Sequence, residues 1–142
     1  MKFSVRIPFV ELLGFELHRF EGGEAEISFK PSDDHLNSFD VVHGGASMTL
    51  LDVVMAHAAR SVQPDMGVVT IEMKTSFMRA AQGPLHAKGR ILHRTATMVF
   101  TEGSIFNAAD QLCAHATGTF KLVPRLATGA GSAQPFNRIS TD

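Results

Sequence analysis

Asp52 is the residue of this sequence whose type and position most clearly indicate chemistry. It stands between two apolar pairs, Leu50-Leu51 and Val53-Val54, inside a predicted helix and too far from the start of that helix to cap it. Because burial of an unpaired carboxylate is costly, such a side chain must be partnered, protonated or retained for function. A structural aspartate bonded to a neighbouring arginine, histidine or amide fits the same pattern. The residue alone leaves both interpretations open.

His43, Gly44 and Gly45 form a second feature, at the predicted start of the same helix. Glycines there allow the close approach of a ligand or of another backbone, and the first N–H groups of a helix have no acceptor within it. These amides lie at the positive end of the helix dipole, where they can polarise a carbonyl or stabilise an oxyanion. A plain Gly-Gly junction between a loop and a helix fits the same residues.

The spacing of the two features limits how they can cooperate. Asp52 follows Gly44 by eight residues, which on one helix means about 12 Å along the axis and a rotation of roughly 80°. One reacting carbonyl cannot contact both residues of a single chain. Two such helices packed antiparallel across a two-fold axis would bring Gly44 of one protomer to Asp52 of its partner. The spacing therefore predicts a homodimer with two composite sites, and an inactive monomer.

The elements that must position these residues follow from periodicity and from turn chemistry. Residues 8–13 predict a short helix with proline in its first turn, and residues 44–61 predict a long helix that is apolar on nearly all sides. Strands are predicted over residues 15–20, 24–30, 68–77, 85–94, 97–106 and 112–123, with a polar loop over 31–40. One isolated helix followed by a meander of strands favours an α+β fold, an antiparallel sheet curved around that helix.

Composition and charge narrow the class of protein. The 142 residues predict one domain over 1–126 and a flexible tail over 127–142, which is rich in small and polar residues. A formal net charge of -1 argues against nucleic-acid binding. The single cysteine, Cys113, and the lack of a histidine ligand motif predict no metal site. Glu11 interrupts the only leader-like stretch and no apolar run spans a membrane, so we expect a cytoplasmic protein without a membrane partner.

One stretch of the chain resembles a known family. The run Asn-Ser-Phe-Asp-Val-Val-His-Gly-Gly-Ala-Ser-Met-Thr-Leu-Leu-Asp at 37–52 closely resembles the signature of hotdog-fold acyl-CoA thioesterases. The match is to the PaaI-like (phenylacetic acid degradation) branch of the 4-hydroxybenzoyl-CoA thioesterase superfamily. The resemblance extends through residues 8–14, 72–78 and 114–120. It implies a hotdog fold, a long helix wrapped by an antiparallel sheet, dimerised edge to edge and paired into tetramers.

The resemblance also implies a role for each matching residue. Asp52 matches the catalytic carboxylate, which acts as general base on water or as nucleophile, and Gly44 matches the residue whose amide polarises the thioester carbonyl. Asn37 matches a polar residue near the carbonyl or the attacking water, and His43 a neighbour that supports the thioester. Thr70 stands where some relatives carry a serine or threonine that helps to place the water.

Further residues are candidates for substrate contact, each also explained by packing or by a solvated surface. They are Gly45 beside the helix start, Phe39, Met48, Met55 and Phe77 for an acyl pocket, and Arg90, His93, Arg94 and Lys121 for the coenzyme A phosphates. Asp40 stands where relatives often have glycine, and aspartate tolerates the left-handed backbone that such a turn needs. Arg94-Thr95-Ala96 replaces the Gly-basic pair that relatives often show, which leaves the phosphate contact open.

Together these observations predict an acyl-CoA thioesterase that releases a free acid and coenzyme A, with coenzyme A as part of the substrate and no cofactor. A hotdog hydratase or dehydratase is the first alternative, but the His-plus-acid motif of those enzymes is absent. A non-catalytic acyl-thioester binder is the second, although a binder has no need for a carboxylate at Asp52. The acyl group, the choice between base and nucleophile, and the choice between dimer and tetramer stay open.

Overall fold

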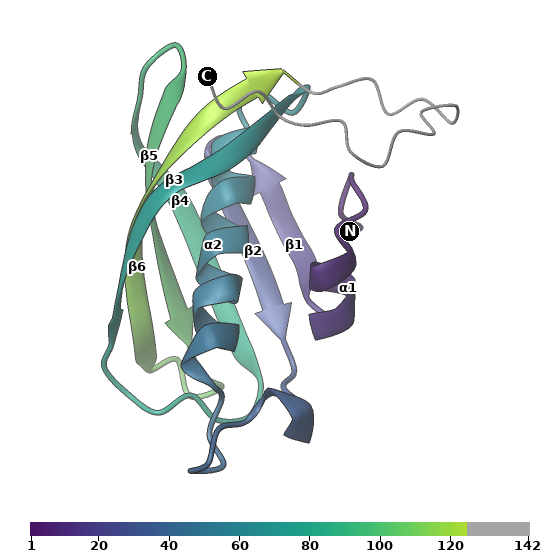
Figure 1. Ribbon diagram of the computed structural model, residues 1–142, viewed down its shortest axis with the longest axis vertical. Helices are drawn as coiled ribbons and strands as arrows, with labels where there is room; N and C mark the ends of the chain where they lie inside the picture. Colours follow the sequence, from purple (N-terminus) through teal and green to yellow (C-terminus); the bar gives the residue numbers. More distant parts are fainter. Residues whose placement is uncertain (125–142) are drawn as a thin grey trace.

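The computed structural model describes residues 1–124, and in it a six-stranded antiparallel sheet curves around one long helix (Figure 1). The strands lie in the order β1-β2-β4-β5-β6-β3. The elements are α1 (Pro8–Leu13), β1 (Glu16–Glu21), β2 (Glu24–Phe29), the 3-10 turn η1 (Asp33–His35), α2 (Gly44–Arg60), β3 (Met66–Phe77), β4 (Leu85–Arg94), β5 (Met98–Phe106) and β6 (Leu112–Pro124). The predicted α+β fold is confirmed; η1 lies within the predicted loop, and the predicted tail lies outside the described residues.

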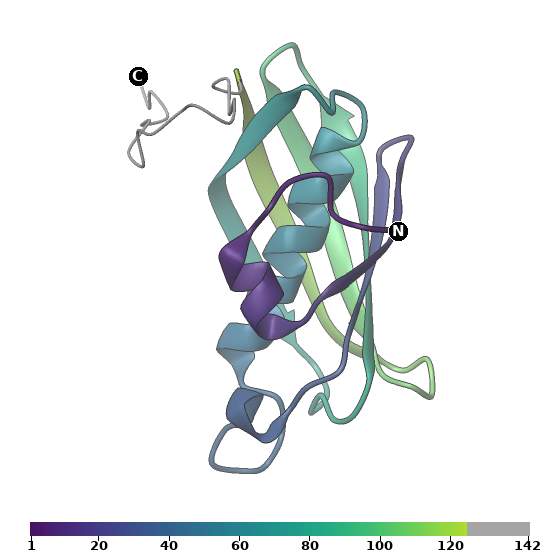
Figure 2. The same cartoon turned by 90° about the vertical axis from the view of Figure 1, so that its right-hand side faces the viewer.

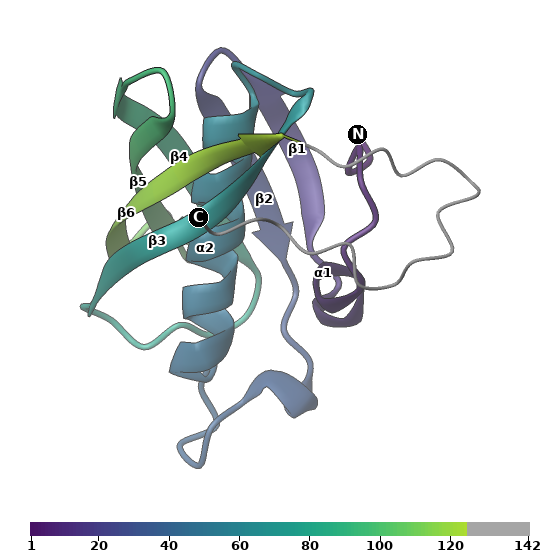
Figure 3. The same cartoon turned by 45° about the horizontal axis from the view of Figure 1, so that its top comes forward.

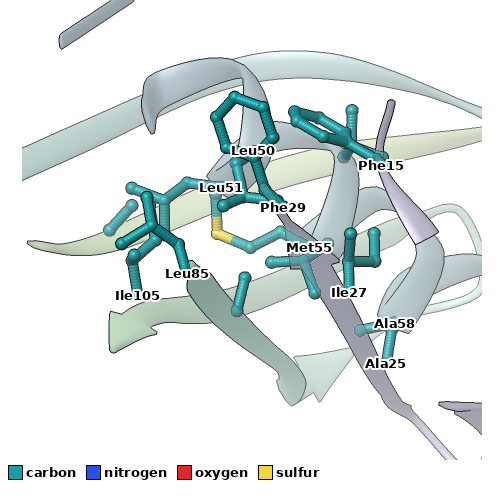
Figure 4. Close-up of a cluster of buried hydrophobic side chains, with 14 of the residues drawn as sticks. Phe15, Ala25, Ile27, Phe29, Leu50, Leu51, Met55, Ala58, Leu85 and Ile105 are labelled. Carbon is teal, nitrogen blue, oxygen red and sulfur yellow. The ribbon is translucent and has the colours of Figure 1, made fainter. Parts of the chain in front are cut away.

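The core fills the space between α2 and the concave face of the sheet (Figure 4). Leu50, Leu51 and Met55 of α2 are fully buried against Ile27 of β2 and Ile105 of β5. Met55, a candidate for an acyl pocket, is therefore a core residue. Burial of large apolar side chains stabilises such a fold by about 1.5–3 kcal/mol each.

Glycine lets the sheet approach the helix backbone at one point. A Cβ atom on Gly89 of β4 would lie 2.6 Å from the carbonyl oxygen of Val54 and 3.2 Å from the amide of Met55. Any larger residue there would push α2 away from the sheet. The packing that Gly89 permits fixes the position of the helix that carries Asp52.

One face of α2 is not enclosed by the sheet, although the sequence of the helix is apolar on nearly all sides. Met48 is 41% exposed, and Asp52 and Ala56 are half-buried. The sheet ends in β1 on one side and in β3 on the other, so it does not close around the helix (Figures 1 and 3). Apolar residues on the uncovered face of α2 are consistent with burial of that face against a surface outside this sheet.

β3 is an edge strand, paired on one side with β6 over residues 66–77. The pairing shifts register between Thr70 and Glu72, a β-bulge that leaves Ile71 53% exposed. A long edge with exposed apolar residues is a template for pairing with a further strand. Thr70 therefore sits at an irregular point of an open edge, directly beside α2.

Candidate active site

The side chains of Asp52 and Thr70 are joined by a hydrogen bond. The Thr70 hydroxyl on β3 donates to Oδ1 of Asp52 on α2, with 2.6 Å between the oxygens. Burial raises the pKa of the Asp52 carboxyl above its ordinary value, and the bond from Thr70 opposes part of that rise. A half-buried carboxylate with a raised pKa is a stronger base than an exposed one and keeps one oxygen for another partner.

The N-terminus of α2 presents one backbone donor with no partner in residues 1–124. The ring of His43 caps the helix, since its Nδ1 accepts from the Gly45 amide at 2.8 Å. The amides of Ala46 and Ser47 donate to the carbonyl of His43. Among these four amides of the first helical turn, only the Gly44 N–H makes no hydrogen bond within residues 1–124. It is therefore the donor available to a carbonyl or an oxyanion.

Asn37 organises the loop in front of this helix start. Its Oδ1 accepts from the amides of Phe39 (2.8 Å) and Val41 (3.3 Å). The turn that follows requires a left-handed residue, and Asp40 has φ of 57°, as expected for aspartate in the place of glycine. The side-chain oxygen of Asn37 is thus occupied by hydrogen bonds within the loop, which leaves the side-chain nitrogen Nδ2 for any contact with a substrate.

The two halves of the candidate site line separate cavities. Gly44, Asn37 and Phe77 line a cavity of about 400 Å³ at the start of α2. Asp52 lines a second cavity of about 290 Å³ farther along the same helix. This separation fits the spacing argument, because the Gly44 amide and the Asp52 carboxylate of one chain face different spaces.

The structure does not bring every candidate residue to these cavities. Phe39 is 83% exposed on its loop, Met48 lies on the uncovered face of α2, and Arg94 is exposed at the end of β4. None of the three lines either cavity. Of the other phosphate candidates, Arg90 is paired with Glu102 at 2.7 Å on the outer face of the sheet, and His93 stacks on Phe100.

The cavity at Gly44 also contains residues that sequence reasoning missed. Ser47, Arg79 and Cys113 line it. Ser47 is one helical turn after Gly44, which is a signal that spacing could have supplied. Arg79 lies two residues after the end of β3 and Cys113 lies on β6, and the Arg79 amide donates to the Cys113 carbonyl. Burial raises the pKa of the Cys113 thiol, so it is a poor nucleophile.

Nothing in residues 1–124 groups three or more His, Cys, Asp or Glu side chains around a possible metal ion. No helix in the same residues is long and apolar enough to cross a membrane.

Comparison with known proteins defines the class. Residues 39–114 match the family model of the thioesterase superfamily. A protein of Archaeoglobus fulgidus named as an esterase is 31% identical over 77% of this chain and 71% of its own. A Ralstonia eutropha structure described as a phenylacetic acid degradation-related thioesterase is 25% identical, with a TM-score of 0.76, over 83% and 92% of the two chains. The Escherichia coli PaaI structure, at 20% identity and a TM-score of 0.76 over 81% and 83%, shares the fold.

The chain belongs to the thioesterase superfamily and has the hotdog fold, as the sequence predicted. It is a thioester hydrolase, and its resemblance to PaaI-like proteins is confirmed.

The bond between Thr70 and Asp52 leads to a prediction about pH dependence. Removing the hydroxyl in Thr70→Val takes away a donor that favours the ionised carboxylate, so the pKa of Asp52 rises further. Activity that needs ionised Asp52 is present above that pKa and is lost as pH falls through it. We expect the acid limb of the kcat/KM profile to move to higher pH in Thr70→Val, measured by thiol release. Thr70→Ser, which keeps the donor, should retain the wild-type limb; an unmoved limb in Thr70→Val would refute the coupling.

Proposed function

We propose that this protein hydrolyses a small or medium acyl-CoA thioester to the free acid and coenzyme A, at two composite sites of a homodimer. The observation that carries the proposal is the pairing of two features on one helix. Asp52 is a half-buried carboxylate of raised pKa beside a cavity, and the Gly44 N–H is an unused donor at the start of the same helix. These are the two groups that hydrolysis of a thioester requires, a base and an oxyanion donor.

In the proposed reaction the thioester carbonyl accepts a hydrogen bond from the Gly44 N–H of one protomer. Asp52 of the partner protomer takes a proton from a water molecule, whose oxygen adds to the carbonyl carbon. The negative charge that develops on the carbonyl oxygen is stabilised by the amide and by the positive end of α2. The C–S bond then breaks, the electron pair leaves with sulfur, and the thiolate of coenzyme A departs. Because a thiolate is a good leaving group, a dedicated strong acid is not needed.

Direct attack by Asp52 is the other route that these groups permit. The carboxylate would then form a mixed anhydride with the acyl group, which water would hydrolyse in a second step. Thr70 supports both routes, since its hydroxyl holds the Asp52 carboxylate in one orientation. Single turnover in ¹⁸O-labelled water detects the nucleophilic route when water attacks the anhydride at the Asp52 carboxyl carbon, because ¹⁸O then enters Asp52 and an original Asp52 oxygen leaves with the acid.

The open edge of the sheet supports the proposed dimer. β3 exposes Ile71 and Phe77 beside its unpaired side, and Phe77 lines the same cavity as Gly44. Pairing of two β3 strands across a two-fold axis would cover both residues and the uncovered face of α2. The same symmetry would bring the helix start of one copy toward Asp52 of the other.

The test of the proposal is release of free thiol from a panel of phenylacetyl, hydroxybenzoyl, short-chain and medium-chain CoA thioesters. We expect the wild-type protein to release coenzyme A from at least one of them well above the uncatalysed rate. Thiol release from none of these substrates would contradict the proposed acyl-CoA hydrolysis.

A further inference from the structure

The cavity beside Asp52 has a shape and a lining that the catalytic role of Asp52 does not explain. It has a volume of about 290 Å³ and lies between α2, the N-terminal segment (residues 1–7) and the start of β3. Its apolar lining consists of Val5, Ile7, Val53, Ala56, Gly67 and Val68. Asp52, Ala56 and Arg60 also line it at positions i, i+4 and i+8 of the helix, so it follows one face of α2 for about 12 Å.

Arg60 lines the cavity at the end away from Asp52. The side chain is buried, and its guanidinium donates to the carbonyls of Pro64 (3.1 Å) and Met66 (3.2 Å) and to the hydroxyl of Ser4 (3.4 Å). These bonds tie the loop after α2 to the N-terminal segment. A ligand that enters beside Asp52 and follows α2 therefore reaches the Arg60 side chain two helical turns farther along.

His57, which also lines the cavity at this end, adds no charge of its own at neutral pH beside the guanidinium of Arg60. Its ring is buried, Nδ1 bonds to the Val53 carbonyl at 2.8 Å, and Phe3 and Phe20 pack edge-on against it. Burial, opposed by the Val53 bond and aided by the nearby Arg60 charge, lowers the pKa of His57 to about 4. The imidazole is then neutral under ordinary conditions.

We infer that this cavity binds the acyl group of the substrate, with the thioester carbonyl at Asp52 and the acyl chain directed along α2 toward Arg60. The inference rests on the proposed function. It assigns the substrate class as an uncharged, apolar acyl group. If each non-hydrogen atom takes about 30 Å³, as a water molecule does in the liquid, the cavity of about 290 Å³ has room for roughly ten such atoms, so we expect an acyl group of about six to eight carbons.

The N-terminal segment sets the size limit in this assignment. Val5 and Ile7 line the cavity together with Ala56 of α2, and Figure 2 shows the segment passing in front of the helix. A change of one or two methyl groups at this wall alters which chain length fills the cavity. Val5, Ile7 and Ala56 are therefore specificity-determining residues.

Chain-length profiles of kcat/KM test the assignment, with butanoyl-, hexanoyl-, octanoyl-, decanoyl- and dodecanoyl-CoA as substrates. We expect a maximum at hexanoyl or octanoyl and a fall of about tenfold or more by dodecanoyl, the scale of discrimination that a hydrophobic pocket reaches. Adipoyl-CoA, which carries a carboxylate at the far end, should be no better than hexanoyl-CoA. A preference for adipoyl-CoA would overturn the assignment of an uncharged acyl group.

Two variants change the cavity in opposite directions. Ala56→Leu fills part of it and should lower kcat/KM for octanoyl-CoA by about tenfold or more while butanoyl-CoA is spared. Val5→Ala enlarges it and should move the maximum to a longer chain. Val62→Ala makes the same change at a half-buried residue outside the cavity and should leave the profile of the wild type. An equal loss at every chain length in Ala56→Leu, or a Val5→Ala profile like that of Val62→Ala, would overturn the inference.

Binding separates this inference from the proposed hydrolysis. Calorimetry with S-alkyl-CoA thioethers, which cannot be hydrolysed, should give the same size dependence and the same shifts in Val5→Ala and Ala56→Leu. Size-dependent binding without thiol release from any thioester would contradict the proposed hydrolysis and support the assignment of the cavity to the acyl group. Thiol release with a chain-length profile that neither variant changes would support the proposed hydrolysis and contradict the assignment of the cavity to the acyl group.

Discussion

Asp52→Asn is expected to lower kcat/KM for thioester hydrolysis by about 10²- to 10⁴-fold, the usual contribution of a positioned base. Asparagine has nearly the shape of aspartate, and its amide oxygen can still accept the hydrogen bond from Thr70. What the variant loses is the ability to take a proton or to attack a carbonyl. Thiol release under kcat/KM conditions measures the effect, and Asp52→Ala should show a comparable loss.

Glu102 supplies the control for this prediction. It is also a partly buried carboxylate that accepts a hydrogen bond, but it lies on β5 facing Arg90. The bond from Arg90 outweighs burial and lowers the pKa of Glu102, whereas burial outweighs the Thr70 bond at Asp52 and raises its pKa. Glu102→Gln should keep activity within about threefold of wild type, because a surface substitution away from the site has small effects. Full activity in Asp52→Asn, with the folded state unchanged by circular dichroism, would rule out both the base and the nucleophile.

The order of helices and strands could be predicted because local signals were strong and agreed with one another. Gly14 ends α1 in the left-handed conformation, at φ of 76°, and Gly22 and Gly23 form the turn between β1 and β2. The longest apolar segment became α2 within one residue of its predicted end. These features depend on neighbours in the chain, which the sequence displays directly.

The exposure of α2 could not be predicted in the same way. Its sequence is apolar on nearly all sides, yet the sheet stops at β3 and leaves Met48 exposed. An apolar face that the chain does not cover itself looks the same in sequence as one that it does cover. Whether the chain covers this face of α2 depends on the strand order. β3, the strand that follows α2 in the chain, pairs only with β6 and lies at the edge of the sheet, not in its middle.

Sequence reasoning placed Asp52 and Gly44 on one helix, as the structure has them, but it did not indicate which side chains surround them. The positions of Asp52 and Gly44 on one helix follow from spacing, and the structure keeps them on different cavities. Thr70 became a candidate only through the family resemblance, which gave it the role of placing the water, and its hydrogen bond to Asp52, 18 residues away in sequence, was not predicted. The cavity walls at Val5 and Arg79 depend on how distant segments pack, for which no short-range pattern exists.

Gly44→Pro is expected to lower kcat/KM by about 10²- to 10³-fold, the effect of losing one oxyanion donor. Proline removes the N–H but is favoured at the first position of a helix, where no intrahelical bond is lost. His43 has ψ of 137°, which suits a residue before proline. Gly44→Ala is the matched control, since it keeps the N–H and its Cβ would only touch the Phe77 ring at 3.4 Å. Equal losses in both variants would show that bulk, and not the amide, matters.

Mixing Asp52→Ala with Gly44→Pro protomers then tests whether the two residues act across the dimer. Each parent homodimer has no complete site, but each mixed dimer regains one, with Asp52 from the Gly44→Pro chain and Gly44 from the Asp52→Ala chain. If subunits exchange at random, half of the dimers are mixed and have one working site of two, so activity should recover to about one quarter of wild type. A mixture that stays inactive, with exchange verified by native mass spectrometry of size-tagged chains, would place both residues in the site of a single chain. The 12 Å of helix between them would then have to be bridged by the substrate itself.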